Sequence, residues 1–298
     1  MKHQPIHLYN RATKRLEREQ VPGGGFLALC YGSAWGRFIT DALLSRVFVS
    51  RVYGRPFHMA WSRRLIEPFV RQNQVPMDEV EVPAGGFGSF NDFFIRRLKP
   101  GARPLPADPE ALIAPADSRL KVFSLNAQTV LEVKANRLTL ADLLNGADAA
   151  QRFLDGICLQ FRLAPCDYHR FGYICDGVQG AIHSVAGRLY SVSPLAMAFR
   201  PFIWGQNFRQ WCVIESNTLG PVLQIDVGAT NVGSIVQHHP AGGPCRRGAE
   251  KGYFQLGGST ILIILPSGRV ELDPDIATYS QQGIETRVRY GEKIGRVL

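Results

Sequence analysis

Apolar positions follow two different periods along this chain, and the change falls near residue 100. Before that point apolar side chains recur every three or four positions; within 35–47 they are Trp35, Phe38, Ile39, Ala42, Leu43 and Val47. This spacing predicts helices over 33–50, 56–73 and 90–97, the last one capped by Ser89 or Asn91. The Pro/Gly-rich segment 98–109 is predicted to be an irregular connector.

Beyond the connector, short apolar runs lie between turn residues, a pattern typical of strands. Strands are predicted at 119–124, 129–134, 157–163, 179–185, 211–215, 221–227, 232–237, 260–265 and 268–272, with a short helix at 138–145 and a terminal strand. Residues 1–22 are predicted to be a polar, loosely ordered arm. The fold class expected is α+β, with an N-terminal helical region (1–84) on a mostly antiparallel β domain (85–298).

Charge is distributed unevenly over these two regions. The net charge is +9, and residues 1–75 contain twelve Lys and Arg against four Asp and Glu, so the remaining chain is almost neutral. A basic segment that also carries Trp, Phe and Leu at helical spacing favours contact with an anionic membrane surface, although packing on its own domain fits the pattern equally well. No apolar run reaches the roughly 18 residues that a membrane-spanning helix needs.

The six cysteines form no C-x-x-C pair, and no apolar secretory signal opens the sequence. We therefore expect no disulfide framework, no zinc or other metal site, and a reducing compartment. A nucleic-acid partner is not expected, because no recognition motif accompanies the basic region.

One stretch interrupts the strand pattern: Gly257-Gly258-Ser259-Thr260 stands directly before the apolar run 261–265. A β-bulge is the simplest interpretation, because glycines relieve crowding between strands. The alternative is a self-cleaving bond: glycine leaves its carbonyl accessible, and the next hydroxyl can attack it in an N-to-O acyl shift. Elimination would then leave Gly258 as a new C-terminus and convert Ser259 into an N-terminal pyruvoyl group.

Five segments around this stretch occur in a fixed order: "SFNDFFIRRLKPGARPL" (89–105), "APADSRL" (114–120), "LAPCDYHRFG" (163–172), "VGATNVGSI" (227–235) and "KGYFQLGGST" (251–260). Together they resemble the phosphatidylserine decarboxylases, pyruvoyl enzymes that arise from self-cleaving proenzymes. The resemblance runs from about residue 85 to the C-terminus, and the Gly-Gly-Ser-Thr form is similar to the family's second type.

The resemblance implies a role for each matching residue. Ser259 matches the serine that becomes the pyruvoyl cofactor, and Gly258–Ser259 matches the cleaved bond. Asp117 matches the aspartate of the processing charge relay, and His169 matches the histidine that protonates the decarboxylated substrate. Asn207 and Arg209 are expected to bind a phosphate or carboxylate of the substrate, with a structural salt bridge as the alternative for the arginine.

The sequence departs from the family pattern at Gly172, where the motif usually carries a second histidine that serves self-cleavage. We expect His169 to serve both steps, with direct action of Asp117 as the second choice. His183, His238 and His239 are further candidates for the missing base.

The expected function is therefore pyruvoyl-dependent decarboxylation of phosphatidylserine to phosphatidylethanolamine, a step of phospholipid biosynthesis, at the cytoplasmic face of a membrane. The two cleaved chains, 1–258 and 259–298, are expected to stay associated, and a homodimer is left open. Two alternatives remain: a decarboxylase of a soluble amino acid on the same scaffold, and an unprocessed lipid-binding protein. Gly172 is the feature that supports the second alternative.

Overall fold

The computed structural model describes residues 6–19, 21, 23–126, 130–133, 136–146, 148–229 and 234–298. Its centre is an eleven-stranded sheet in the order β16-β11-β13-β14-β18-β9-β6-β20-β1-β2, with β12 beside β13. All pairs are antiparallel except β1 with β20. These strands are β1 (His7–Asn10), β2 (Arg15–Arg18), β6 (Ser118–Ser124), β9 (Ile157–Leu163), β11 (Gly177–Gln179), β12 (His183–Val185), β13 (Arg209–Ser216), β14 (Gly220–Gly228), β16 (Gly243–Cys245), β18 (Ser259–Leu265) and β20 (Glu285–Val288).

Four smaller sheets flank this one. Three strands form β10-β17-β15, three form β19-β21-β5, and two hairpin-like pairs are β3-β4 and β7-β8. Their bounds are β3 (Val80–Glu81), β4 (Arg97–Leu98), β5 (Ala111–Ile113), β7 (Val130–Val133), β8 (Asn136–Thr139), β10 (Arg170–Gly172), β15 (Ile235–Gln237), β17 (Glu250–Phe254), β19 (Val270–Leu272) and β21 (Lys293–Val297). The architecture is mixed α+β with mostly antiparallel sheets, as the sequence predicted.

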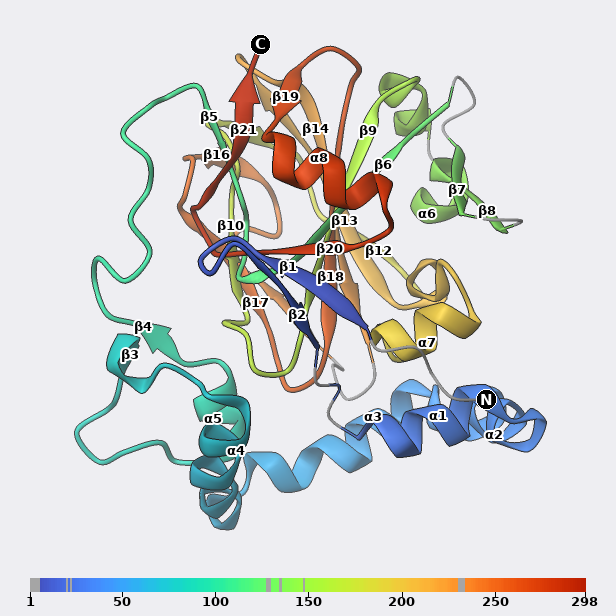
Figure 1. Cartoon of the computed structure of the whole chain (residues 1–298), viewed down its shortest axis with the longest axis vertical. Helices are drawn as coiled ribbons and strands as arrows, with labels where there is room; N and C mark the ends of the chain where they lie inside the picture. The colour runs from blue at the N-terminus through green and yellow to red at the C-terminus, as the bar shows by residue number, and fades with distance from the viewer. Residues whose placement is uncertain are drawn as a thin grey trace.

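Helices cover one end of the β structure. Figure 1 shows α1, α2 and α3 in a row across the bottom of the molecule, continuing into α4 and α5. The α-helices are α1 (Gly24–Gly32), α2 (Ala34–Ile39), α3 (Val47–Gly54), α4 (Ile66–Asn73), α5 (Phe90–Phe94), α6 (Leu140–Leu144), α7 (Pro194–Phe199) and α8 (Pro274–Gln281). The structure also contains one π-helical turn, Thr40–Leu44, between α2 and α3. The 3₁₀ turns are Arg55–His58, Ala60–Leu65, Met77–Glu79, Asp148–Phe153 and Ile203–Gln206.

The cap predicted for α5 is present, since the Ser89 hydroxyl accepts a hydrogen bond from the Asp92 amide at 3.1 Å. The helices predicted over 33–50 and 56–73 are broken into shorter pieces. Among the described helices none is both long and apolar enough to cross a bilayer.

The polar arm expected over 1–22 was wrong, because residues 7–18 form β1 and β2 in the main sheet. Long-range contacts hold this hairpin. Arg11 makes ion pairs with Asp273 at 2.6 Å and Asp275 at 2.8 Å, and the Tyr9 ring stacks on Tyr279 with centroids 4.1 Å apart. These partners lie more than 260 residues away, so local sequence patterns carry no sign of them.

The continuous apolar run of β18 follows from burial on both sides. Ile261, Ile263 and Leu265 belong to one core cluster, whereas Leu262 and Ile264 belong to another on the opposite face of the sheet. A central strand with two buried faces has no solvent-facing positions, so it reads as an apolar run instead of an alternation. Ser259 opens this strand, at the edge of the core.

Candidate active site

The Gly-Gly-Ser-Thr stretch lies where a loop enters the central sheet. Ser259 is the first residue of β18 and stands opposite Gly228 of β14 and Leu163 of β9. Gly257, two residues before Ser259, has φ +133°, a conformation that residues with a side chain rarely adopt. The Ser259 side chain is fully buried, and its Oγ has no hydrogen-bond partner among the residues that the structure describes. A buried hydroxyl without a partner is costly, which is typical of groups held for chemistry instead of stability.

His169 lies beside the same segment of sheet. Its Nε2 is 3.0 Å from the carbonyl oxygen of Ala164, the residue after the Ser259 partner Leu163. The Phe254 amide of β17, which leads into the glycines, donates to the His169 carbonyl at 2.9 Å. His169 is therefore bonded to both segments that flank the glycine–serine bond.

The imidazole of His169 is held in its neutral form. Burial, followed by the nearby charge of Arg96, lowers the pKa of His169 to about 3. A bond from Nε2–H to a carbonyl assigns the proton to Nε2, so Nδ1 carries a lone pair, and this atom has no hydrogen-bond partner of normal geometry. The ring stacks on Phe94 with centroids 4.0 Å apart, which fixes its plane. The imidazole is therefore neutral and oriented, with a lone pair that can accept a proton, and its low pKa makes it a weak base.

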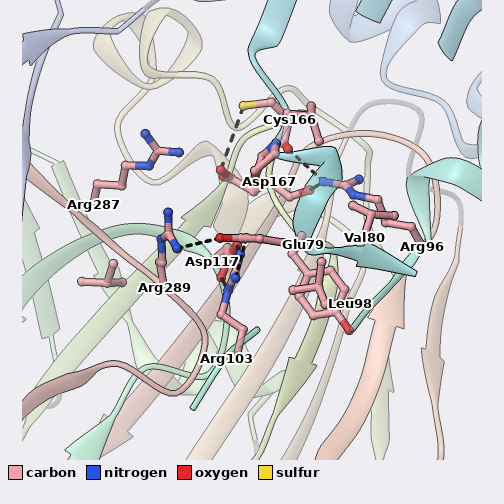
Figure 2. Close-up of a pocket in the computed structure, with 14 residues that line it drawn as sticks. Glu79, Val80, Arg96, Leu98, Arg103, Asp117, Cys166, Asp167, Arg287 and Arg289 are labelled. Carbon is pink, nitrogen blue, oxygen red and sulfur yellow. Dashed lines mark hydrogen bonds and ion pairs between the residues drawn. The ribbon is translucent and has the colours of Figure 1, made fainter. Parts of the chain in front are cut away.

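Asp117 belongs to a separate ion-pair network, shown in Figure 2. Arg103 binds both of its oxygens, at 2.9 Å to Oδ1 and 2.6 Å to Oδ2, and the Tyr290 amide donates to Oδ1 at 2.8 Å. Arg103 also binds Glu79 at 2.7 Å, and Arg289 binds Glu79 at 3.0 Å. In the part of the chain that the structure describes, no hydrogen bond joins Asp117 to His169 or Ser259. No hydrogen bond joins Ser259 to His169 in that part of the chain either. The two residues are connected through neighbours, since His169 bonds to Ala164 and Ser259 pairs with Leu163, whereas Asp117 is bound to arginine.

The space at Gly172 is filled from the C-terminal segment. A Cβ atom at this position would lie 2.1 Å from the Tyr290 hydroxyl oxygen and 2.7 Å from the Ala249 carbonyl oxygen. The Tyr290 hydroxyl donates to the Gly248 carbonyl at 3.0 Å, and burial raises its pKa, so it stays protonated. Tyr290 therefore occupies the place where a second histidine would begin, while its amide holds Asp117.

We expect Gly172→Ala to lower the free energy of unfolding by about 1–3 kcal/mol, because the new methyl group overlaps the Tyr290 side chain and a carbonyl. In a Tyr290→Leu background the loss is expected to be smaller, since the closest atom is gone. Denaturant titration of the four proteins measures both effects. Gly85→Ala is the control, because nothing lies within 4 Å of its Cβ position. Equal losses in both backgrounds would contradict the assigned contact.

A cavity of about 600 Å³ opens beside the glycines. Its walls are the helical region and the ends of the central strands, and they are mostly apolar; they include Phe26, Leu27, Val49, Tyr53, Phe57, Phe94, Leu163, Val192, Gly257 and Gly258. Among its described lining residues only Glu19 and Arg162 are charged, and they form an ion pair at 2.6 Å. Although burial opposes ionisation, Arg162 and Arg119 hold the pKa of Glu19 below its usual value. The cavity is thus apolar with one charged end.

Asn207 and Arg209 make only main-chain hydrogen bonds. The Asn207 amide bonds Tyr190 and the Gly228 carbonyl, and Arg209 donates to the carbonyls of Asp142, Leu143, Gly205 and Asn207. These bonds support a structural role for both residues. The partners of Arg209 are main-chain carbonyls, whereas the alternative expected from the sequence was a salt bridge. Binding of substrate by either residue stays a prediction.

Sequence reasoning did not single out Arg96, Arg103 or Tyr290. Arg96 and Arg103 lie within the quoted segment 89–105, so a motif signal existed, but nothing in it indicates that they approach Asp117 and His169. Tyr290 carries no local signal at all, since its role depends on the space left at Gly172.

Comparison with known proteins identifies the family of this chain. The family model described as phosphatidylserine decarboxylase matches residues 90–296. The phosphatidylserine decarboxylase proenzyme of Clostridium botulinum (strain Alaska E43 / Type E3) is 37% identical over 291 residues, which cover 97% of this chain and 98% of that protein. The proenzymes of Clostridium tetani and Ruminiclostridium cellulolyticum are each 37% identical and cover 98% of this chain, as well as 98% of their own lengths.

The similarity to these relatives extends over the basic N-terminal quarter, which lies outside the family-model match and outside the segments quoted from the sequence. The resemblance seen in those segments is confirmed. This chain belongs to the phosphatidylserine decarboxylase family.

Proposed function

We propose that this protein cleaves itself between Gly258 and Ser259 and then decarboxylates phosphatidylserine at a membrane surface. The observation that carries the proposal is the apolar cavity, which runs from the helical region to Gly257 and Gly258. Acyl chains fit such walls, and a headgroup that follows them would arrive beside Ser259. The curated relatives, named phosphatidylserine decarboxylase proenzymes, support both the cleavage and the substrate.

Self-cleavage needs a nucleophile and a base. In the proposed step His169 Nδ1 takes the proton of Ser259 Oγ, which attacks the Gly258 carbonyl carbon and replaces the amide by an ester. Loss of the α-proton of Ser259 then breaks the ester, freeing the Gly258 carboxylate, and addition of water releases the nitrogen as ammonia. The unpaired Ser259 Oγ and His169 Nδ1 fit these roles, because neither must first give up another bond.

The pyruvoyl group left at position 259 would supply the electron-accepting carbonyl for decarboxylation of an amine substrate. Residues of this chain do the rest. Arg162, which lines the cavity and is paired with Glu19 and Glu285, would attract the phosphate of the headgroup, while the headgroup amine stays free to react with the carbonyl. The apolar walls would exclude water, and His169 would return the proton to the substrate after carbon dioxide has left.

The two cleaved chains are expected to remain together. Residues 259–298 contribute β18 between β14 and β9, β20 beside β6, and β21 beside β5. Cleavage removes one peptide bond but none of these ladders, so the core stays intact.

Contact with an anionic membrane is proposed from the helical region. Its exposed large apolar side chains include Phe26, Leu29, Trp35, Phe38, Leu43 and Phe48, and Trp35 is 78% exposed. They lie on α1 to α3 and the π-helical turn between them, in the row of helices at the bottom of Figure 1. Apolar residues at such density, in a basic segment, favour a membrane interface.

The proposal is tested with phosphatidylserine vesicles, on which formation of phosphatidylethanolamine is measured by mass spectrometry. We expect a triple variant, Trp35→Ser, Phe38→Ser and Phe48→Ser, to bind these vesicles at least about tenfold more weakly, because three exposed aromatic side chains no longer enter the interface. Turnover of detergent-dispersed lipid is expected to be unchanged.

Val178→Ser is the control for the triple variant, since Val178 is 57% exposed on β11, a strand of the main sheet outside the helical region. Unchanged vesicle binding by the triple variant would remove the membrane role of these helices. Turnover of free serine without turnover of the lipid would favour the soluble-substrate alternative.

A further inference from the structure

A small second pocket is lined by Asp117 and by Cys166, Asp167 and Tyr168, which precede His169, and it shares no lining residue with the large cavity. Figure 2 shows its side chains. Its volume is about 40 Å³, space for about three water-sized groups. Four arginines line it, Arg96, Arg103, Arg287 and Arg289. We call it the Arg96 pocket; it is far too small for a lipid.

Arg96 is the unusual member of this lining. The residue is 4% exposed, and its Nη2 donates to the carbonyls of Cys166 at 3.1 Å and Asp167 at 3.0 Å. Its Nε and Nη1 are buried and have no hydrogen-bond partner. Buried guanidinium donors without acceptors are costly, so a missing acceptor is indicated. Burial lowers the pKa of Arg96, while the nearby carboxylates of Asp117 and Asp167 oppose this shift.

The carboxylates that line the pocket do not supply this acceptor. Asp117 is bound by Arg103, and Glu79 by Arg103 and Arg289. Asp167 is bound by Arg119, which lies outside the lining, and by the Ala164 amide at 2.7 Å. Among the described residues, Arg96 and Arg287 make no ion pair. Arg96 instead lies over the Phe93 ring, with its Cζ atom 4.9 Å from the ring centroid. The four arginines that line the pocket outnumber its three carboxylates, so the lining has an excess of positive charge.

We propose that the Arg96 pocket binds a compact oxyanion of the size of inorganic phosphate. Each free N–H of a guanidinium group can donate a charge-assisted hydrogen bond to an oxyanion, and the unpaired Nε and Nη1 of Arg96 are two such donors on different edges of the group. The buried Arg96 would supply the directed hydrogen bonds, while the exposed Arg287 adds charge at the mouth. This site goes beyond the proposed decarboxylase function and does not depend on it.

Binding is measured by isothermal titration of the full chain with inorganic phosphate at millimolar concentrations. Ionic strength is held constant with sodium gluconate, an anion too large for the pocket. We expect one saturable site and a rise in melting temperature that follows its occupancy. Because high phosphate concentrations stabilise proteins by exclusion from their surfaces, only the saturable part of the rise counts.

Arg96→Met and Arg287→Gln are each expected to weaken phosphate binding by about tenfold or more, because a charge-assisted contact is lost. Arg287→Gln keeps the test valid if Arg96→Met fails to fold, since Arg287 is exposed. Arg269→Gln, a change of an exposed arginine outside the pocket lining, is expected to bind phosphate as the unchanged chain does.

Absence of a saturable site, or equal affinity in all three variants, would overturn the proposal. The first result would mean that the pocket holds only water, and the second that phosphate binds elsewhere. Neither result bears on self-cleavage, because the measurement has no activity readout.

Discussion

Replacing Ser259 by alanine is expected to abolish self-cleavage and leave one chain of residues 1–298. The unchanged protein is expected to give two chains, residues 1–258 and a 259–298 chain without a free amino terminus. The reason is that Ser259 Oγ is the atom proposed to attack the Gly258 carbonyl, and alanine has no nucleophile. Intact mass under denaturing conditions distinguishes these outcomes directly. Decarboxylation is lost with the cut, since the electron-accepting carbonyl is never made.

The free energy of unfolding shows whether the loss of self-cleavage in Ser259→Ala comes from the missing hydroxyl or from misfolding. Ser259 Oγ is buried without a partner, so its removal is expected to change the free energy of unfolding by less than about 1 kcal/mol or to increase it. Thr260→Val is the matched control. Thr260 is the next residue, is equally buried and also has an unpaired hydroxyl, but it is not the attacking group. We expect Thr260→Val to be cut normally.

Two results would reverse this interpretation. A cut Ser259→Ala chain would place the nucleophile elsewhere. A folded, unchanged protein that stays uncut would favour the unprocessed lipid-binding alternative, in which Gly172 marks the loss of self-cleavage.

The sequence predicted most of the central strands because their signal is local. The run 260–265 and the strand 157–163 are apolar segments between turn residues, and both appear almost as expected in β18 and β9. The hairpin β1–β2 was missed, because its strands are polar and depend on partners such as Asp273 and Tyr279 near the other end of the chain. Pattern reasoning has no access to contacts of that kind.

Some features of the candidate site could likewise be predicted from the sequence, and others could not. Ser259 could be selected from sequence, since glycines before a hydroxyl are a chemical pattern readable in a row of letters. The electrostatic state of His169 could not, because it depends on burial and on Arg96, 73 positions earlier. Likewise, the sequence does not show that the Tyr290 side chain fills the space beside Gly172 where the family's second histidine would begin. The identities of the site residues could be predicted from the sequence, whereas their surroundings in the fold could not.

His169→Gln is expected to slow self-cleavage by at least about a hundredfold, because general bases contribute 10²–10⁴ in rate. Glutamine keeps an amide that can donate to the Ala164 carbonyl but has no basic lone pair. The rate is followed as loss of the uncut chain in freshly synthesised protein. His183→Ala is the control; this histidine is exposed and stacks on Trp211, and its removal is expected to leave the rate unchanged.

The dependence of the cleavage rate on pH distinguishes His169 from an exposed histidine as the base. Because burial and the Arg96 charge lower the pKa of His169 to about 3, its imidazole is deprotonated throughout the neutral range. The cleavage rate is therefore expected to stay flat between about pH 5 and pH 8 and to fall only as the pH approaches the lowered pKa. An exposed histidine with a pKa of about 6.5 would instead lose about tenfold in rate by pH 5.5.

Asp117→Asn decides between the two bases considered for this chain. Both Asp117 oxygens are bound by Arg103, so the carboxylate must leave an ion pair before it can accept a proton, whereas His169 Nδ1 is already free. We expect Asp117→Asn to slow cleavage far less than His169→Gln in protein that is equally folded. If His169→Gln is cut at the normal rate and Asp117→Asn is not, Asp117 is the base and His169 serves decarboxylation alone.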